Sequence, residues 1–310
     1  MRIAISGASG YIGQHLSSFL EGKGYDVIPL GRDLFKEDCF DELCRCVESC
    51  EVVINLAGAS INKRWTEAYK QELYDSRICV TRQLVHAINT RSVKLELFIS
   101  ASAVGYYPAF GEYDEYHDCR GMDFLARLCG AWEEEASACS SDVSLVITRF
   151  GVVLSEDGGA LKEMLRLQRF SRVSVVIGNG QQRFPWISLF DLCRSFGYII
   201  RNRQMRGVVN LVSPDLITQK QLAHTLARAD KIRRIIPLPE FFFRLKFGEG
   251  ASFVTKGQTV HPSKLQESGF IYIYPTIEKL MNITDHHTVP ELDVKRYMGR
   301  WYEIARYENH

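Results

Sequence analysis

The residues best suited to chemistry lie near the start of the chain, in the stretch ISGASGYIG (5–13). Gly7, Gly10 and Gly13 stand between a β-branched run and a helical pattern. Glycines at this spacing permit a tight turn, let the backbone approach a pyrophosphate and let the helix pack closely on the strand. The helix N-terminus would present unpaired N–H groups to the phosphates. We therefore predict a dinucleotide-binding loop here.

The residues after the second strand-like run, DVIPL (26–30), bear on the choice of dinucleotide. Folds that bind NAD place a carboxylate near this position for the adenosine ribose, whereas a guanidinium can hold a 2′-phosphate. The first charged residue here is Arg32, and Asp33 follows it. The sequence therefore favours NADP, while Asp33 keeps NAD open.

The elements that would position this loop alternate between β-branched runs and helical patterns up to about residue 155. Such alternation is typical of βαβ units and a parallel sheet. Five nearly continuous apolar runs are predicted as buried strands: 2–6, 26–30, 51–58, 95–102 and 144–154. The segment 64–90 is long enough for two helical segments. We predict an α/β fold, a Rossmann-type doubly wound parallel sheet (about 1–155) with a smaller C-terminal substrate-binding part (about 156–282).

Composition narrows the class of partner. Lys and Arg number 38 against 37 Asp and Glu, which gives a net charge of +1 and no footprint for nucleic acid or an anionic membrane as the main partner. The opening MRIAIS is not a secretory signal, and no apolar run would span a bilayer. We expect a cytoplasmic protein that acts on a small-molecule substrate. The composition is also compatible with a homodimer.

The nine cysteines are an odd number and are scattered, which indicates reduced thiols rather than a disulfide framework. Cys39, Cys44, Cys46 and Cys50 cluster, but they lack the paired C-x-x-C hooks of zinc sites. His15, His86 and His117 show no ligand spacing either. No metal site is predicted.

Several ordered motifs carry a family resemblance: VINLAGASINKRW (53–65), SASAVGYYP (100–108), LCGAWEEEA (128–136), TRFGVVLSEDGGAL (148–161) and IGNGQQRFPWISLFDL (177–192). Over about residues 1–282 the chain resembles an atypical extended short-chain dehydrogenase/reductase of the SulA-like family of sugar-nucleotide epimerases. The resemblance implies NADP across the carboxyl ends of the strands. It assigns cofactor contacts to Gly7, Ser9, Gly10, Tyr11, Ile12, Gly13, Arg32, Asn55, Leu56, Ala57, Gly58, Ser100, Ala101 and Arg149.

The catalytic residues of the extended relatives are matched only in part. Those enzymes pair a Ser or Thr with Tyr-x-x-x-Lys, in which the lysine lowers the pKa of the phenol. Ser102 matches the serine, but Leu125 and Cys129 stand where the pair is expected. Tyr106 and Tyr107 are candidate proton donors, with a role as plain wall residues as the alternative.

Other side chains near these motifs have less certain roles. Lys63, Arg64 and Glu112 are further candidates for an acid, Trp132 is expected to be packing, and Trp186 is expected to line a cleft. We therefore expect an NADP-dependent oxidoreductase or epimerase that acts on a small substrate, with nucleotide-linked sugars as the suggested class. The alternative is an NADP-binding sensor or scaffold without turnover.

The last stretch, PELDVKRYMGRWYEIARYENH (290–310), does not follow the epimerase pattern. Its Gly299-x-Trp301 motif resembles the opening of a bacterial lipocalin. A lipocalin barrel needs about eight strands. Residues 289–310 are therefore expected to be a truncated lipocalin-like segment that contributes nothing to NADP binding.

Overall fold

A computed structural model describes residues 1–91 and 95–282 of the chain. The lipocalin-like segment predicted at 289–310 lies outside the described residues.

The predicted parallel sheet is confirmed and has six strands in the order β10-β6-β4-β3-β1-β2, all of them parallel. Their bounds are β1 (Arg2–Ser6), β2 (Asp26–Leu30), β3 (Val52–Asn55), β4 (Leu97–Ala103), β6 (Ser144–Phe150) and β10 (Gly207–Leu211). Every residue of β3 is buried, as expected for a strand covered on both faces. The sixth strand, β10, comes from beyond residue 155, so the two parts of the chain interleave.

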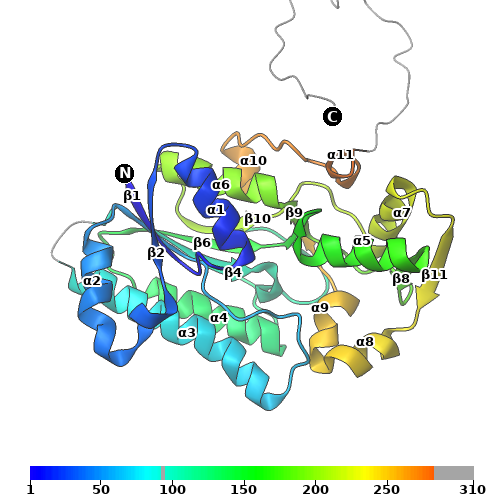
Figure 1. Cartoon of the computed structure of the whole chain (residues 1–310), viewed down its shortest axis with the longest axis horizontal. Coiled ribbons are helices and arrows are strands. Elements are labelled where there is room, and N and C mark those ends of the chain that lie inside the picture. Colours follow the sequence, from blue (N-terminus) through cyan, green and yellow to red (C-terminus); the bar gives the residue numbers. More distant parts are fainter. Residues whose placement is uncertain (92–94, 283–310) are drawn as a thin grey trace, which may run out of the picture.

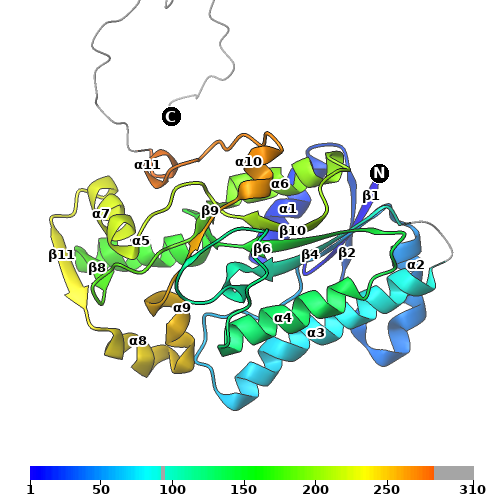
Figure 2. The same cartoon turned by 180° about the vertical axis from the view of Figure 1, so that it is seen from behind.

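Helices cover both faces of this sheet (Figures 1 and 2). One face carries α1 (Tyr11–Glu21) and α6 (Leu189–Arg201), and the other carries α2 (Phe40–Glu48), α3 (Glu67–Thr90) and α4 (Phe124–Ser137). Apolar side chains fill both interfaces: Leu16 and Phe196 on the first, Leu43 and Leu84 on the second. The molecule is thus a three-layer α/β structure.

The strand order reverses between β1 and β3, because β2 lies on one side of β1 and β3 on the other. In open α/β sheets ligands bind outside the carboxyl ends of the strands at such a reversal. The glycine-rich loop leaves β1 at this point, so the topology and the sequence motif indicate the same place.

Most of the C-terminal part extends from one end of the sheet, but the short helix Ser263–Glu267 lies beside β10 and α6 (Figure 1). Its helices are α5 (Gly159–Ser171), α7 (Gln219–Ala229), α8 (Glu240–Phe247), α9 (Ser252–Thr255), α10 (Ser263–Glu267) and α11 (Ile277–Leu280). Three two-stranded pairs complete the fold: β7 (Val152–Ser155) with β9 (Trp186–Ser188), β8 (Val173–Ile177) with β11 (Arg234–Leu238), and β5 (Glu112–Tyr113) with β12 (Thr259–Val260). Among the described residues no helix is both long and apolar enough to cross a membrane.

Three details differ from the expectations. Segment 64–90 forms the single helix α3, capped by Thr66, because no glycine or proline interrupts it. The run 144–154 is split at Gly151, where a Cβ would lie 2.9 Å from the Pro185 carbonyl oxygen and the chain crosses to another sheet. Trp186 lines no cleft but is fully buried, because β9 directs it into a core with Leu161 and Leu165.

Candidate functional site

The glycine-rich loop is closed by backbone contacts that leave no room for side chains. Gly7 has a φ of +74°, and a Cβ on it would lie 2.8 Å from the carbonyl carbon and oxygen of Leu56. A Cβ on Gly13 would lie only 2.2 Å from the carbonyl oxygen of Gly7. The loop after β1 therefore packs directly on the loop after β3, and it does so through bare backbone.

Helix α1 begins at the end of this loop. Its N-cap is Gly10, and no side chain caps that end within the described structure. The first N–H groups therefore stay available to an anion, as a phosphate site needs. Ser9 and Gly10 are exposed, whereas Ile12 is half-buried.

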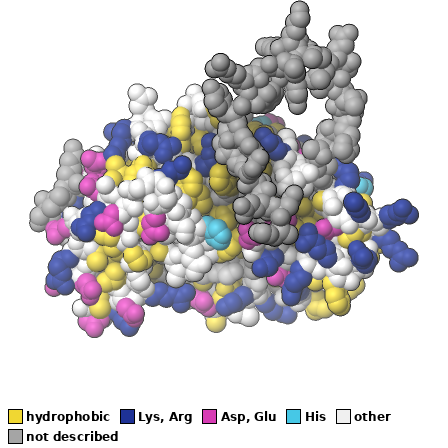
Figure 3. Space-filling model, turned by 45° about the horizontal axis from the view of Figure 1, so that its top comes forward, with side chains coloured by type: hydrophobic (Ala, Val, Ile, Leu, Met, Phe, Trp, Pro, Cys, Tyr) yellow, Lys and Arg dark blue, Asp and Glu magenta, His cyan; other side chains and the backbone are white. Residues whose placement is uncertain are grey.

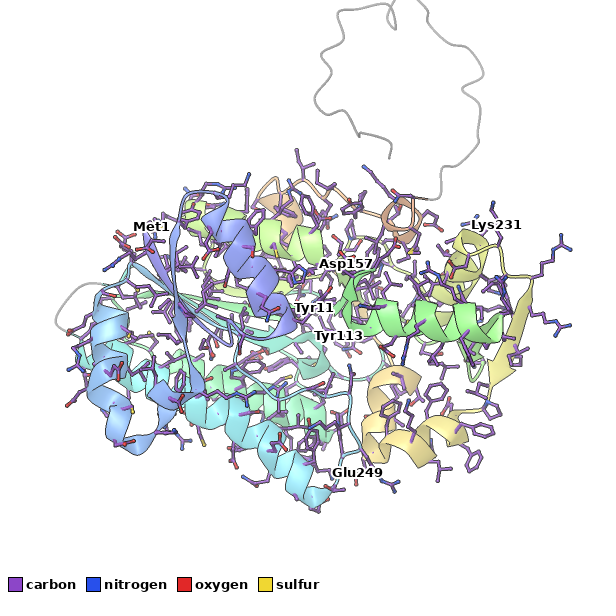
Figure 4. All side chains as sticks on the ribbon, in the orientation of Figure 1. Met1, Tyr11, Tyr113, Asp157, Lys231 and Glu249 are labelled. Atoms are coloured by element: carbon purple, nitrogen blue, oxygen red, sulfur yellow. The ribbon has the colours of Figure 1, made fainter. Side chains whose placement is uncertain are left out.

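Tyr11, the first residue of α1, joins the loop to the C-terminal part. A Cβ on Gly158 would lie 2.2 Å from the Tyr11 ring. Figure 4 shows Tyr11 beside Asp157 at the start of α5. The Tyr11 hydroxyl is buried and has no hydrogen-bond partner among the described residues, so a polar group of a ligand could satisfy it.

Arg32 is the second residue after β2, separated from it by Gly31, and it is exposed. No carboxylate in the described part of the chain forms an ion pair with it. Asp33, in contrast, forms an ion pair with Lys36, whose hydrogen bond and charge lower the pKa of the Asp33 carboxyl. The guanidinium is thus free for an anion, while the neighbouring carboxylate already has a cationic partner.

The buried side chain of Asn55 supports the loop after β3 through hydrogen bonds. This residue is fully buried; its Oδ1 accepts a 2.6 Å bond from the Ser6 hydroxyl, and its Nδ2 donates to the Thr81 hydroxyl at 2.7 Å. Oδ1 also lies 3.3 Å from the amide nitrogen of Ala57. Asn55 therefore shapes the loop from inside the sheet.

A buried guanidinium fixes the next turn of the same loop. Arg77 donates to the carbonyl oxygen of Ala59 at 3.0 Å and lies 5.3 Å from the Trp132 ring. A Cβ on Gly58 would lie 2.9 Å from its Cζ. Trp132 is packing, as predicted, with its Nε1 bonded to Thr81.

Ser102 lies near the carboxyl end of β4 and takes part in a buried polar cluster. Its hydroxyl donates a 2.6 Å bond to Oε1 of Glu133. Arg149, which is opposite Ser102 in the β4–β6 register, donates from Nε to Oε1 at 2.8 Å and from Nη2 to Oε2 at 2.7 Å. Burial lowers the pKa of Arg149, but the bonds and charge of Glu133 outweigh it and the pKa is raised. The cluster is a bidentate ion pair that orients a serine hydroxyl.

Tyr106 and Tyr107 flank this cluster in different ways. The Tyr106 ring lies 3.5 Å from the guanidinium carbon of Arg149, and its half-buried hydroxyl donates to Asp118 at 3.1 Å. Burial raises the pKa of Tyr106, against the lowering effect of Arg149. Tyr107 is 2 % exposed and its hydroxyl lies 2.8 Å from the Asp114 carbonyl oxygen, which is a wall position.

Sequence reasoning missed Glu133. Leu125, Cys129 and Glu133 are spaced four apart on α4, so they follow one another along one face of the helix. The first two replace the Tyr and Lys, and burial raises the pKa of the Cys129 thiol to about 12. The spacing of these three residues could have indicated Glu133, because it places a glutamate on the buried face of the helix, where a charged side chain requires a partner.

The remaining residues that the sequence suggested for the site are buried in the sheet or contact other side chains and backbone groups of the protein. Ser100 and Ala101 are buried within β4. The Lys63 ammonium lies 4.9 Å from the Tyr69 ring centroid, Arg64 donates to the Leu245 carbonyl oxygen, and Glu112 pairs with His261.

A groove of about 520 Å³ lies on the C-terminal part, lined by side chains of α7, β11 and α11. It contains none of the residues that the sequence singles out, so it is separate from the candidate site.

Comparison with known proteins gives two matching family models. Residues 3–211 match the NAD dependent epimerase/dehydratase family, and residues 238–282 match a domain of unknown function. Neither match reaches beyond residue 282, so the lipocalin resemblance gains no support from them.

Individual relatives match over most of the chain. It is 33% identical over 307 residues to the epimerase family protein YfhF of Bacillus subtilis, covering 93% of this chain and 100% of that one. The human epimerase family protein SDR39U1, crystallised with NADPH, has a TM-score of 0.83 at 32% identity, covering 91% and 98%. A nucleoside-diphosphate sugar epimerase from Corynebacterium glutamicum has a TM-score of 0.72 at 26% identity, covering 91% and 57%.

The first family model and the relatives agree with the fold and with the epimerase resemblance of the sequence. The chain belongs to the NAD dependent epimerase/dehydratase family.

Proposed function

We propose that this protein binds NADP(H) at the carboxyl ends of β1 to β4 and acts as an oxidoreductase or epimerase on a small, nucleotide-linked substrate. The observation that carries the proposal is the glycine loop, whose bare backbone and uncapped helix fit a pyrophosphate. The NADPH in the crystals of human SDR39U1 supports the choice of cofactor. Residues 1–282 would form the functional unit, with a substrate part at about 156–282.

Arg32→Ala is expected to remove a preference for NADPH over NADH. A charge-assisted bond from the guanidinium to the 2′-phosphate contributes about 1.5–3 kcal/mol, which is a factor of roughly 10–150 in affinity. Fluorescence titration with both cofactors measures it. Arg45→Ala, an exposed arginine of α2, is the control. Equal affinities of the unmutated protein for the two cofactors would contradict the assignment.

The buried cluster supports a role for Ser102 at the reacting centre. Because its proton is donated to Glu133, the Ser102 oxygen can still accept a hydrogen bond from a substrate hydroxyl. Arg149 holds both carboxylate oxygens of Glu133 in a bidentate contact, so this side chain is fixed in place and orients the Ser102 hydroxyl. Bound NADPH would supply the reducing equivalent.

Proton transfer would then fall to Tyr106, the more accessible of the two tyrosines. Its raised pKa keeps the phenol protonated near neutral pH, and no lysine stands at the position that would favour the phenolate. A phenol can donate a proton to the oxygen of a carbonyl that is being reduced. This arrangement favours reduction over the oxidation that begins an epimerisation cycle.

The alternative is an NADP-binding sensor without turnover. The observation that favours it is the replacement of the Tyr-x-x-x-Lys pair by Leu125 and by Cys129, a buried thiol that cannot stand in for an ammonium. The two proposals share the cofactor and differ only in whether a substrate consumes it.

Ser102→Ala is expected to lower the rate of NADPH consumption by about 10²-fold or more, the lower range for general acid–base assistance, with cofactor affinity unchanged. The measurement is NADPH absorbance during incubation with a panel of keto sugar nucleotides. Cys129→Ala is the matched control and should retain most of the rate. If Cys129→Ala lost more of the rate than Ser102→Ala at equal stability, Ser102 would not be at the reacting centre. If the unmutated protein consumed no NADPH with any substrate of the panel, the sensor would be favoured.

A further inference from the structure

The end of the C-terminal part carries a cluster of unpaired cations. Strands β8 and β11 run in parallel with Val173 opposite Arg234, so the residues just before them, Arg172 and Arg233, lie side by side. We call Arg172, Lys231, Arg233 and Arg234 the basic end. All four are exposed, and none has a carboxylate partner in the described structure.

Two nearby arginines differ from those of the basic end, because each forms an ion pair with a carboxylate. Arg169 pairs with Asp230, and Arg228 pairs with Glu278. The acidic side chains of this region are therefore already occupied. Figure 3 shows Lys and Arg side chains gathered at the right-hand end of the molecule, and Figure 4 marks Lys231 at the same end.

Large apolar side chains are exposed next to these cations in sequence and on α8, which follows the other end of β11. Phe170, two residues before Arg172, is 91 % exposed, and Ile236, which shares a face of β11 with Arg234, is 45 % exposed. Helix α8 follows β11 after one residue. It exposes Phe241, Phe242 and Leu245, the last of them by 63 %. Exposed apolar groups of this size beside cations indicate a binding surface.

We infer that this end of the molecule docks on a membrane surface rich in anionic phospholipid, with the basic end on the headgroups and the α8 side chains inserted at the boundary with the acyl chains. Such binding combines electrostatic attraction with burial of apolar area. The net charge of +1 does not oppose it, because the excess of cations is local and is balanced elsewhere on the chain.

Two other partners fit less well. A second copy of this chain would bring two basic ends together in a symmetric contact, which costs repulsion. Single-stranded nucleic acid could stack on the exposed Phe rings but would leave Ile236 and Leu245 without a partner, because neither has a π-face. A bilayer accepts aliphatic and aromatic side chains alike.

Docking there would lie next to the candidate site. Arg64 donates to the Leu245 carbonyl oxygen, and the Trp65 amide donates to that of Phe247, so α8 is fastened to the segment that follows the β3 loop. A membrane at α8 would therefore lie close to the segment that follows the β3 loop.

The test is co-sedimentation of the full chain with vesicles of phosphatidylcholine, alone or mixed with phosphatidylglycerol. We expect binding only to the mixed vesicles, weakened by salt. Arg233→Ala with Arg234→Ala should weaken it about 30-fold, since each cation near the surface contributes about 1 kcal/mol. The matched control is Lys23→Ala with Arg45→Ala, two exposed cations on α1's connecting turn and α2 that should change binding by less than about twofold.

A second pair, Phe241→Ser with Phe242→Ser, tests insertion and should weaken binding at least about tenfold with the cations intact. NADPH titration of each variant verifies that it is folded. Equal binding to both vesicle types, equal losses in the two cation pairs, or full binding by the Phe pair would overturn the inference. So would tighter binding to single-stranded DNA than to the mixed vesicles.

Discussion

Gly13→Ala is expected to weaken NADPH binding by roughly 100-fold. The added Cβ would lie 2.2 Å from the Gly7 carbonyl oxygen and 2.7 Å from the Cα of Ala8, both of them backbone atoms of the loop. Forcing a methyl group into a closed contact costs about 1–3 kcal/mol, and here the strain is relieved only by opening the loop that would hold the pyrophosphate. Isothermal titration with NADPH measures the loss.

Gly31→Ala is the control for this change. Its φ is −69° and a Cβ there meets nothing within 4 Å, so the substitution should leave folding intact. Far-ultraviolet circular dichroism would verify that both variants are folded. Unchanged NADPH affinity in folded Gly13→Ala would remove the loop from the cofactor site and with it the basis of the proposed function.

The parts of the fold that could be predicted are those fixed by local signals. The β1 strand, the Gly7–Gly13 loop and the start of α1 follow from residues adjacent in sequence. The sheet followed from the repeated apolar runs, and the inner strands β1, β3, β4 and β6 are mostly buried as predicted. The run 26–30 was wrongly predicted as buried, because β2 lies at the edge of the sheet and only its Leu30 is buried. The break between β6 and β7 at Gly151 also has a local signal, because a glycine interrupts the apolar run. A single glycine does not show, however, which segment approaches it.

The parts that escaped prediction depend on contacts between distant segments. Trp186 beside a proline resembles a surface aromatic until the pairing of β9 with β7 turns it into the core. Glu133 resembles one charge among three in EEE (133–135), and only the packing of α4 on the sheet selects it for Arg149. Both placements depend on tertiary contacts. Periodicity in the sequence therefore indicates which face of a helix or strand is buried, but not which residue packs against it.

Glu133→Gln is expected to lower the free energy of unfolding by about 3–5 kcal/mol, because removing one member of a buried ion pair leaves the other charge uncompensated. Arg149 would keep its charge in a site where its side chain is 5 % exposed. Urea unfolding without cofactor, followed by circular dichroism, measures the change. The exposed pair Glu163–Arg166 supplies the control: Glu163→Gln should cost no more than about 1 kcal/mol.

Replacing both members of the pair separates the energetic role from the positioning role. In Glu133→Leu with Arg149→Met no charge is left buried, so stability should recover most of the loss seen in Glu133→Gln. Ser102 would then lack its acceptor, and the rate of NADPH consumption should be low although most of the stability has returned. If the double variant regained both stability and rate, the pair would be structural only, and Ser102 would not depend on Glu133 for its orientation.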